Sequence, residues 1–245
     1  GRTQGGHVGP RPGQGERRIF GVNAYIMKKI AAVAYNNDAA FVQFSGDLIN
    51  GYLDNGPETQ LQYTNWKKSV EPFWHYMPFQ VGMGNHEALG YIFRDSTGRA
   101  MGFVDKFPFE TESAESAFSK AFVNPVSSLK SEDGSKYDPS SQTRDFPSYS
   151  ENVYHYRYDN GAVVVLNSDY WYAPTLSGNP ITSGGLHGYI MDNQLNWLEE
   201  TILSLEKDMT IDHVFVTQHT PVFPNGGHSR DDMWYGGNND MRPYV

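Results

Sequence analysis

The chain has 245 residues, which suits one large domain or two small ones with a sizeable buried core. Its net charge of −9 disfavours a general surface for nucleic acid or anionic membrane, and no run of about 20 apolar residues predicts a membrane span. The absence of cysteine excludes disulfides, thiolate metal sites and a thiol nucleophile, so any metal site must use histidines, carboxylates and amides.

The first predicted unit is a helix followed by a short strand. Residues 1–21 are rich in Gly, Pro and Arg and indicate a loop. From Val22 onward, apolar residues recur at helical spacing until a polar cluster at 36–38 ends the helix. The apolar run 39–44 then predicts a strand that is covered on both faces. This strand ends at Ser-Gly-Asp, residues 45–47.

A second unit repeats this order. Residues 57–76 predict a helix that ends near Pro72, and residues 79–83 predict a strand followed by Gly-Asn-His-Glu at 84–87. An alternation of helix, strand and polar loop is typical of α/β layered folds. In open α/β sheets, ligands bind at the carboxyl ends of the strands, which is where both polar loops fall.

Residues 88–150 interrupt this rhythm. Ser, Asp, Lys and Pro dominate the second half of this segment, so we predict an insertion with one short helix near 114–122. An ordered insertion of this length often serves as a lid or as a cap that selects substrates.

The last third of the chain predicts a hairpin, a helix and a strand. An Asn-Gly pair between the strand-like runs 153–158 and 162–167 is a strong hairpin signal. Apolar residues share one helical face over 191–205. The strand predicted at 213–217 ends just before His219.

Three predicted strand ends therefore carry polar side chains, namely Asp47, Asn85 with His86, and His219. Asp, Asn and His supply oxygen and nitrogen ligands suited to Zn, Mn or Fe, and the two oxygens of an aspartate can each reach one of two cations. Each residue taken alone also has a simpler interpretation. Asp47 can cap a turn or a helix, Asn85 and His86 can form a polar turn, and His219 can merely terminate a strand.

Taken together, these residues resemble the signature blocks of the calcineurin-like metallophosphoesterases. Gly-Asp at 46–47 and Gly-Asn-His-Glu at 84–87 are similar to the second and third blocks, and His219 is similar to the histidine of the fourth. The stretch 219–228 resembles the corresponding part of the purple acid phosphatase branch. The resemblance implies an α/β fold, arranged as a four-layered α/β/β/α sandwich.

The resemblance also implies a role for each residue. Asp47 would bridge two metal ions, and Asn85 and His219 would bind the second of them. His86 would be the catalytic histidine that faces the leaving-group oxygen. The expected cofactors are two divalent or trivalent ions (Fe, Mn or Zn), and the expected reaction is attack of a metal-bound hydroxide on a small-molecule phosphoester.

Other parts of the family pattern fit less closely. His228 and Arg230 are candidates for contacting the phosphate, although ordinary loop positions are the simpler interpretation. The opening Asp-x-His block and the closing Gly-His-x-His block are not in this sequence. We therefore expect residues 1–245 to be an interior fragment of a single catalytic domain, partial at both ends, with the insertion at about 88–150. Asn50 stands where purple acid phosphatases carry an iron-binding tyrosine, so their tyrosinate colour is not expected.

Two alternatives to phosphoester hydrolysis stay open. A degenerate domain that lost its first and last blocks could act as a structural or binding module, and exposed aromatic residues could bind carbohydrate. The aromatic run 170–172 either lines a substrate cleft or packs in the core, and packing is the simpler interpretation. The substrate, the metal and the oligomeric state cannot be read from the residues, and an extracytoplasmic location rests on the family likeness alone.

Overall fold

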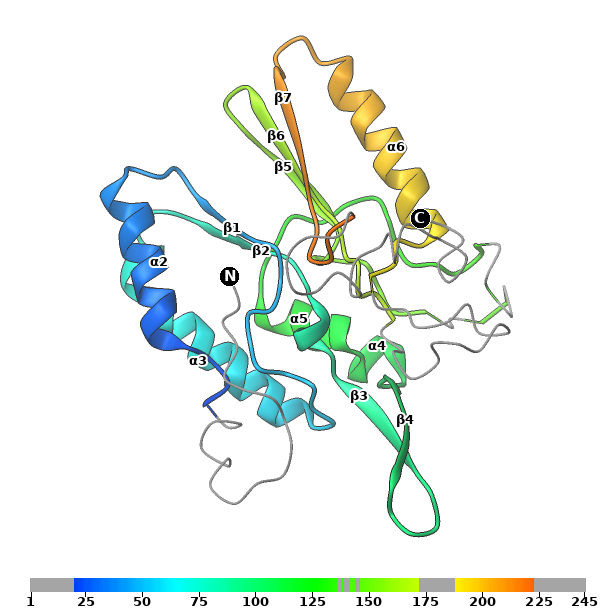
Figure 1. The fold of residues 1–245 in the computed structure, drawn as a ribbon. Helices are drawn as coiled ribbons and strands as arrows, with labels where there is room; N and C mark the ends of the chain where they lie inside the picture. The colour runs from blue at the N-terminus through cyan, green and yellow to red at the C-terminus, as the bar shows by residue number, and fades with distance from the viewer. Residues whose placement is uncertain (1–19, 136–137, 139–141, 144–145, 172–187, 223–245) are drawn as a thin grey trace.

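The computed structural model describes residues 20–135, 138, 142–143, 146–171 and 188–222. These residues form a mixed α/β structure of helices and three small sheets (Figure 1). Among the described helices, none has the length and apolar character of a segment that crosses a bilayer.

The first sheet pairs β1 (Val42–Phe44) and β2 (Phe79–Val81) in parallel. Two helices, α2 (Ala24–Asn36) and α3 (Gly56–Trp74), pack on this sheet (Figure 1). The apolar residues of these four elements form one core, which includes Met27, Ala31, Trp66, Val70, Phe79 and Val81. The two predicted helix–strand units are therefore present, with strands shorter than predicted.

The ends of the two helices follow from local hydrogen bonding. The side chains of Asn23 and Asn55 each accept a backbone N–H from the first turn of the helix that follows, at 3.2 Å in both cases. Helix α3 ends at Trp74, two residues after Pro72, as predicted to within the usual uncertainty of a helix end. Pro72 lies in the last turn, where its missing N–H costs a single helical hydrogen bond and so does not stop the helix.

The three-stranded sheet has the order β5 (Tyr154–Tyr158), β6 (Gly161–Val165) and β7 (His213–Thr217). β5 and β6 form an antiparallel hairpin, and β7 runs parallel to β6. Helix α6 (Asp192–Glu206) covers one face of this sheet, and the shared core includes Ala162, Val164, Trp197 and Leu205. The predicted hairpin, helix and final strand are thus confirmed.

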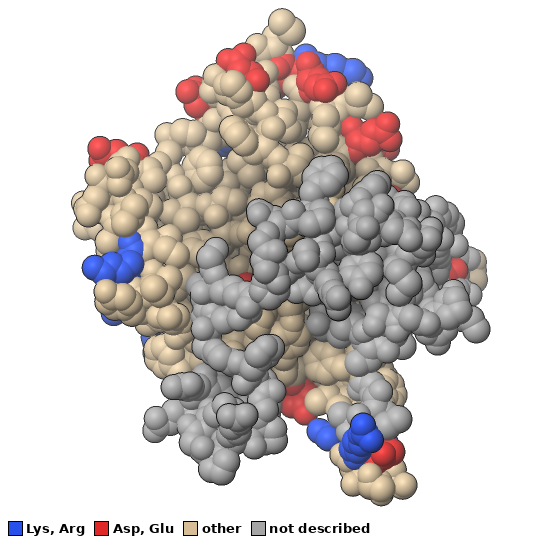
Figure 2. Space-filling model, viewed as in Figure 1, with Lys and Arg blue, Asp and Glu red and all other residues tan. Residues whose placement is uncertain are grey.

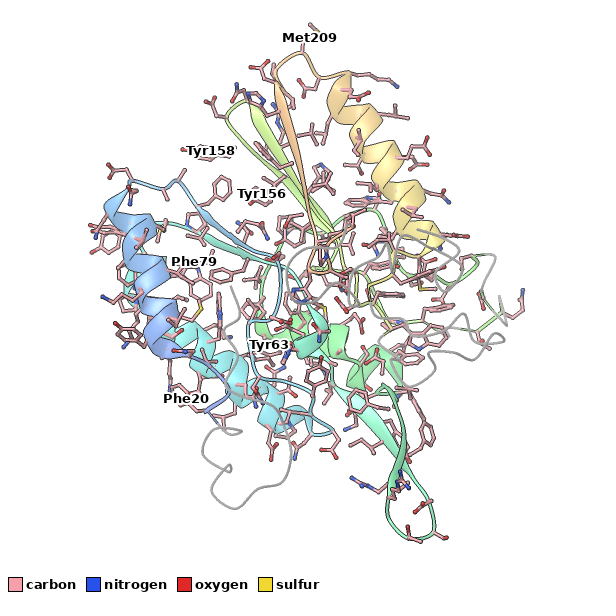
Figure 3. All side chains as sticks on the ribbon, in the orientation of Figure 1. Phe20, Tyr63, Phe79, Tyr156, Tyr158 and Met209 are labelled. Carbon is pink, nitrogen blue, oxygen red and sulfur yellow. The ribbon has the colours of Figure 1, made fainter. Side chains whose placement is uncertain are left out.

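The opposite face of this sheet meets β1 and β2. The rings of Phe41 and Tyr156 lie edge to face at 5.5 Å, and Figure 3 shows Tyr156 between the two sheets. The Tyr156 hydroxyl donates to Gln43 Oε1 at 3.0 Å, and the Tyr154 hydroxyl donates to the Val81 carbonyl at 2.7 Å. The two sheets therefore contact each other through tyrosines, with α2 and α3 on one side and α6 on the other.

The segment predicted as an insertion has more regular structure than expected. It contains an antiparallel hairpin of β3 (Gly90–Arg94) and β4 (Ala100–Asp105), followed by α4 (Phe109–Glu112) and α5 (Ala114–Ala121). Helix α5 confirms the predicted short helix and packs on α3. The hairpin was not predicted.

The hairpin turn is built by one aspartate. Asp95 Oδ1 accepts the backbone N–H of Thr97 at 2.8 Å and that of Arg99 at 3.0 Å. Gly98 adopts a left-handed backbone conformation with φ +83°. The apolar run Tyr-Ile-Phe at 91–93 in β3 is short and does not alternate with polar residues, so the sequence gives a weak strand signal.

Charged side chains are spread over the described surface. On the face drawn in Figure 2, Lys and Arg lie in separate places, including the tip of the molecule where the β3–β4 hairpin projects, and acidic side chains lie near them. The described part of this face therefore offers a polyanion no continuous basic surface.

Candidate functional site

Four of the predicted site residues converge at the carboxyl ends of β1, β2 and β7. Asp47 follows β1, Asn85 and His86 follow β2, and His219 follows β7. His219 Nε2 lies 3.0 Å from Asn85 Oδ1 and 3.2 Å from Asp47 Oδ1. His86 Nε2 lies 4.0 Å from Asp47 Oδ2. Residues more than 130 positions apart in the chain, such as Asn85 and His219, are therefore in direct contact.

A close approach of two backbones brings the first two loops together. Gly46 has φ +117°, and a Cβ on this residue would lie 2.4 Å from the backbone nitrogen of Gly84. Asp47 itself adopts a left-handed conformation with φ +57°. Only glycine fits at position 46, and the sharp turn that it permits points the Asp47 side chain toward His86 and His219.

Glu87 joins the same two loops through hydrogen bonds. Its buried carboxylate accepts the backbone N–H groups of Asp47 at 2.8 Å, Leu48 at 2.7 Å and Gly84 at 2.7 Å. Burial and the charge of Asp47 raise the pKa of Glu87 to about 8, whereas the three N–H donors act in the opposite direction. Glu87 is thus occupied with backbone groups and orients Asp47, a role that the sequence analysis did not assign.

His86 is held by its δ nitrogen. Nδ1 lies 2.7 Å from the carbonyl oxygen of Asn50, and the backbone N–H of His86 donates to Asp47 Oδ1 at 3.2 Å. Because a carbonyl oxygen can only accept, Nδ1 carries the proton in the neutral ring. Nε2 is then the ring nitrogen without a proton in the neutral ring, and it is the one near the Asp47 carboxylate. Asn50, expected at the position of an iron-binding tyrosine, contributes its backbone carbonyl here.

His219 is supported by the loop that follows β6. The backbone N–H of Thr220 donates to Ser168 Oγ at 3.1 Å, and Ser168 Oγ donates to Asp169 Oδ2 at 2.9 Å. All three of these residues are buried. This short chain of hydrogen bonds fixes the backbone immediately after His219, so the imidazole is presented from a rigid position.

The donor set of Asp47, Asn85 and His219 fits a metal ion. Two ligand atoms that each lie about 2.1 Å from a shared ion are about 3 Å apart when they subtend a right angle, and the 3.0 and 3.2 Å separations around His219 Nε2 agree with that spacing. Among the described residues, no group of three or more histidines, aspartates or glutamates is arranged to hold a metal. The set therefore depends on the amide oxygen of Asn85 as one of its ligands.

One further residue of the site was not predicted. The ring of Tyr52 lies edge to face on the His86 ring, with 4.5 Å between centroids, and its hydroxyl contacts the side-chain amide nitrogen of Asn85. The sequence around Tyr52 gives no signal for this role, because Tyr52 reaches the site only through an unusual backbone turn.

The remaining candidates fall into two groups, those outside the described residues and those in the aromatic run 170–172. His228, Arg230 and Tyr172 lie outside the described residues. Tyr170 is buried and stacks on Tyr149 with 4.0 Å between ring centroids. Trp171 packs edge to face on Phe146 at 4.5 Å. The described part of the aromatic run 170–172 thus packs in the core, as the simpler interpretation predicted.

Comparisons with known proteins bear on this geometry. A family model described as calcineurin-like phosphoesterase matches residues 19–245. The match includes both strand-end loops and His219. A comparison with curated proteins found no match to the chain.

Proposed function

The chain belongs to the calcineurin-like phosphoesterase family, and we propose that it hydrolyses a small-molecule phosphoester at a dinuclear metal centre. The observation that carries this proposal is the convergence of Asp47, Asn85 and His219 at one edge of the sheets, with His86 beside them. Family membership supports metal-dependent phosphoester hydrolysis in general. The dinuclear centre and the likeness to purple acid phosphatases are our finer proposals.

We assign Asp47, Asn85 and His219 as metal ligands. The two carboxylate oxygens of Asp47 face different neighbours, since Oδ1 is near His219 and Oδ2 is near His86, which suits an aspartate that bridges two ions. Bound ions of the Fe, Mn or Zn type would supply Lewis acidity toward the phosphoryl oxygens and water of lowered pKa. His228 and Arg230 are proposed to contact the phosphate.

We assign His86 as the general acid. With its Nδ1 proton held by the Asn50 carbonyl, the second proton of the imidazolium resides on Nε2. As the bond from phosphorus to the leaving oxygen breaks, Nε2 donates its proton to that oxygen and the ring returns to its neutral form.

We propose that the fold is the four-layered sandwich of this family, within a single domain. The tyrosine contacts between the β1–β2 and β5–β6–β7 sheets, with helices outside both, support this arrangement. Residues 88–150 are proposed to be an insertion that influences substrate choice, because β3 begins two residues after Ala88 and so lies next to the loop of His86.

The test is a phosphoesterase assay with the full-length protein that contains residues 1–245. After treatment with EDTA, p-nitrophenyl phosphate and bis(p-nitrophenyl) phosphate would be offered with added Mn²⁺, Zn²⁺ or Fe²⁺. We expect turnover that requires added metal, and its loss in Asp47→Ala and His86→Ala at unchanged circular dichroism. His155→Ala, an exposed histidine on β5, is the control and should retain activity. Wild-type protein that binds metal without hydrolysing either ester would instead favour the degenerate binding module.

A further inference from the structure

The segment between Asp47 and α3 makes an unusual turn against the His86 loop. Gly51 and Tyr52 both adopt left-handed conformations, each with φ +53°. For an aromatic residue this conformation is strained, so the surrounding structure must compensate for it. At Gly51 a Cβ would lie 1.3 Å from the His86 carbonyl oxygen, which shows how closely this segment is pressed onto the site.

Anchors on both sides hold Tyr52 in this position. Before it, the backbone N–H of Gly51 donates to Gln62 Oε1 at 3.0 Å. After it, the buried Leu53 pairs with Leu89 in a short parallel bridge. Tyr52 is only partly buried, so its side chain lies on the wall of the candidate site and is not part of the core. The turn therefore directs Tyr52 to the site.

Tyr52 contacts two of the assigned site residues at once. Its ring edge meets the His86 imidazole, and its hydroxyl meets Asn85 Nδ2. Asn85 Nδ2 has only N–H donors, so the tyrosine oxygen is the acceptor in this contact. The other end of the same amide, Oδ1, points to His219 Nε2 at 3.0 Å.

We propose that Tyr52 is a positioning residue for the metal centre, an inference that rests on the proposed function. An amide can rotate by half a turn and exchange its oxygen and nitrogen, and a nitrogen directed at the ion would not bind it. By accepting the side-chain N–H of Asn85, the Tyr52 hydroxyl holds the amide oxygen toward His219 Nε2. The ring of Tyr52 in turn limits the orientations of His86.

Removal of one oxygen atom tests this proposal. Tyr52→Phe keeps the ring and its packing and deletes only the hydroxyl. We expect the dissociation constant for Mn²⁺, measured by calorimetry on the EDTA-treated full chain, to rise about tenfold, as is common when a group that orients a metal ligand is lost. The melting temperature without metal should stay unchanged. Tyr158→Phe removes an exposed hydroxyl on β5 and should leave the dissociation constant as in the wild type.

The outcomes separate this inference from the proposed function. Equal Mn²⁺ affinity of wild type and Tyr52→Phe overturns the inference, as does a loss of affinity that comes with a lower metal-free melting temperature. A tenfold loss in affinity in a chain that hydrolyses no phosphoester supports the positioning role and counts against the enzyme. Absence of Mn²⁺ binding by the wild type overturns both.

Discussion

The carboxylate of Glu87 accepts the backbone N–H of Asp47 at 2.8 Å, although the two residues are 40 positions apart. The same carboxylate accepts the N–H groups of Leu48 and Gly84, so one buried side chain joins the loop after β1 to the loop after β2. Because the proposed ligands Asp47 and Asn85 stand on these two loops, Glu87 sets their spacing without contributing a ligand itself.

Glu87→Gln should therefore loosen the site through the backbone. An amide presents an NH₂ group in place of one carboxylate oxygen, and that group would face at least one backbone N–H with nothing to accept it. We expect a loss of about 2–3 kcal/mol in the free energy of unfolding, measured by urea denaturation at a pH above the raised pKa of Glu87, about 8, where its side chain is a carboxylate. Glu199→Gln, an exposed change on α6, is the control and should have no measurable effect. Equal stability of the two variants would contradict this role of Glu87.

Gly46→Ala should be far more damaging than another glycine substitution in the same region. At position 46 the new methyl group would overlap backbone atoms of Met83 and Gly84, and the left-handed conformation would add strain. At Gly56, the first residue of α3, the new methyl group has no atom within 4 Å. We expect Gly46→Ala to lower the melting temperature by several degrees and Gly56→Ala to leave it unchanged or slightly higher. A similar melting temperature for both would refute the proposed close approach.

The sequence predicts the elements whose apolar residues follow one clear period. Helices α2 and α6 and strand β7 lie where that period places them. The β3–β4 hairpin escaped prediction because exposed aromatic residues such as Tyr91 interrupt the usual alternation, and its turn is fixed by hydrogen bonds to one aspartate side chain.

The residues of the site also divide into those that the sequence predicts and those that it does not. Asp47, Asn85, His86 and His219 are predictable because each follows a strand and carries a side chain with metal-binding or acid–base chemistry. Glu87 and Tyr52 contribute through backbone N–H groups and a left-handed turn. Residue type does not encode these features, so only the folded chain reveals them.

His219→Ala should separate metal binding from folding. Without the imidazole, the proposed metal centre loses the nitrogen that lies 3.0 Å from Asn85 Oδ1 and 3.2 Å from Asp47 Oδ1. We expect the Mn²⁺ dissociation constant to rise by more than about 100-fold, beyond what loss of a supporting residue causes. His213→Ala at the start of the same strand, where the side chain is exposed, serves as control. Unchanged affinity in His219→Ala would remove this residue from the proposed metal centre.

A buried pair of acids beside the hairpin should make stability depend on pH. Asp105 and Glu115 are both buried, and one oxygen of each, Asp105 Oδ2 and Glu115 Oε2, has no hydrogen-bond donor among the described residues. We therefore expect the two carboxyl groups to share one proton. Burial raises the pKa of both groups, and the charge of Glu115 raises that of Asp105 further. The folded chain thus keeps a proton that the unfolded chain releases above about pH 4, so this contribution to stability falls as the pH rises toward the raised pKa.

Glu115→Gln should flatten that dependence. The side-chain N–H of the new glutamine can replace the shared proton at every pH. Its side-chain oxygen can still accept the backbone N–H of Trp171, which donates to Glu115 Oε1 at 3.1 Å. We expect the urea midpoint of the wild type to fall between pH 5 and pH 8 and that of Glu115→Gln to fall less, so that the variant is the more stable of the two at pH 8. Glu112→Gln, which alters a half-exposed carboxyl on α4, is the control and should follow the wild type. A midpoint for Glu115→Gln that falls as steeply as that of the wild type would show that the pair does not share a proton.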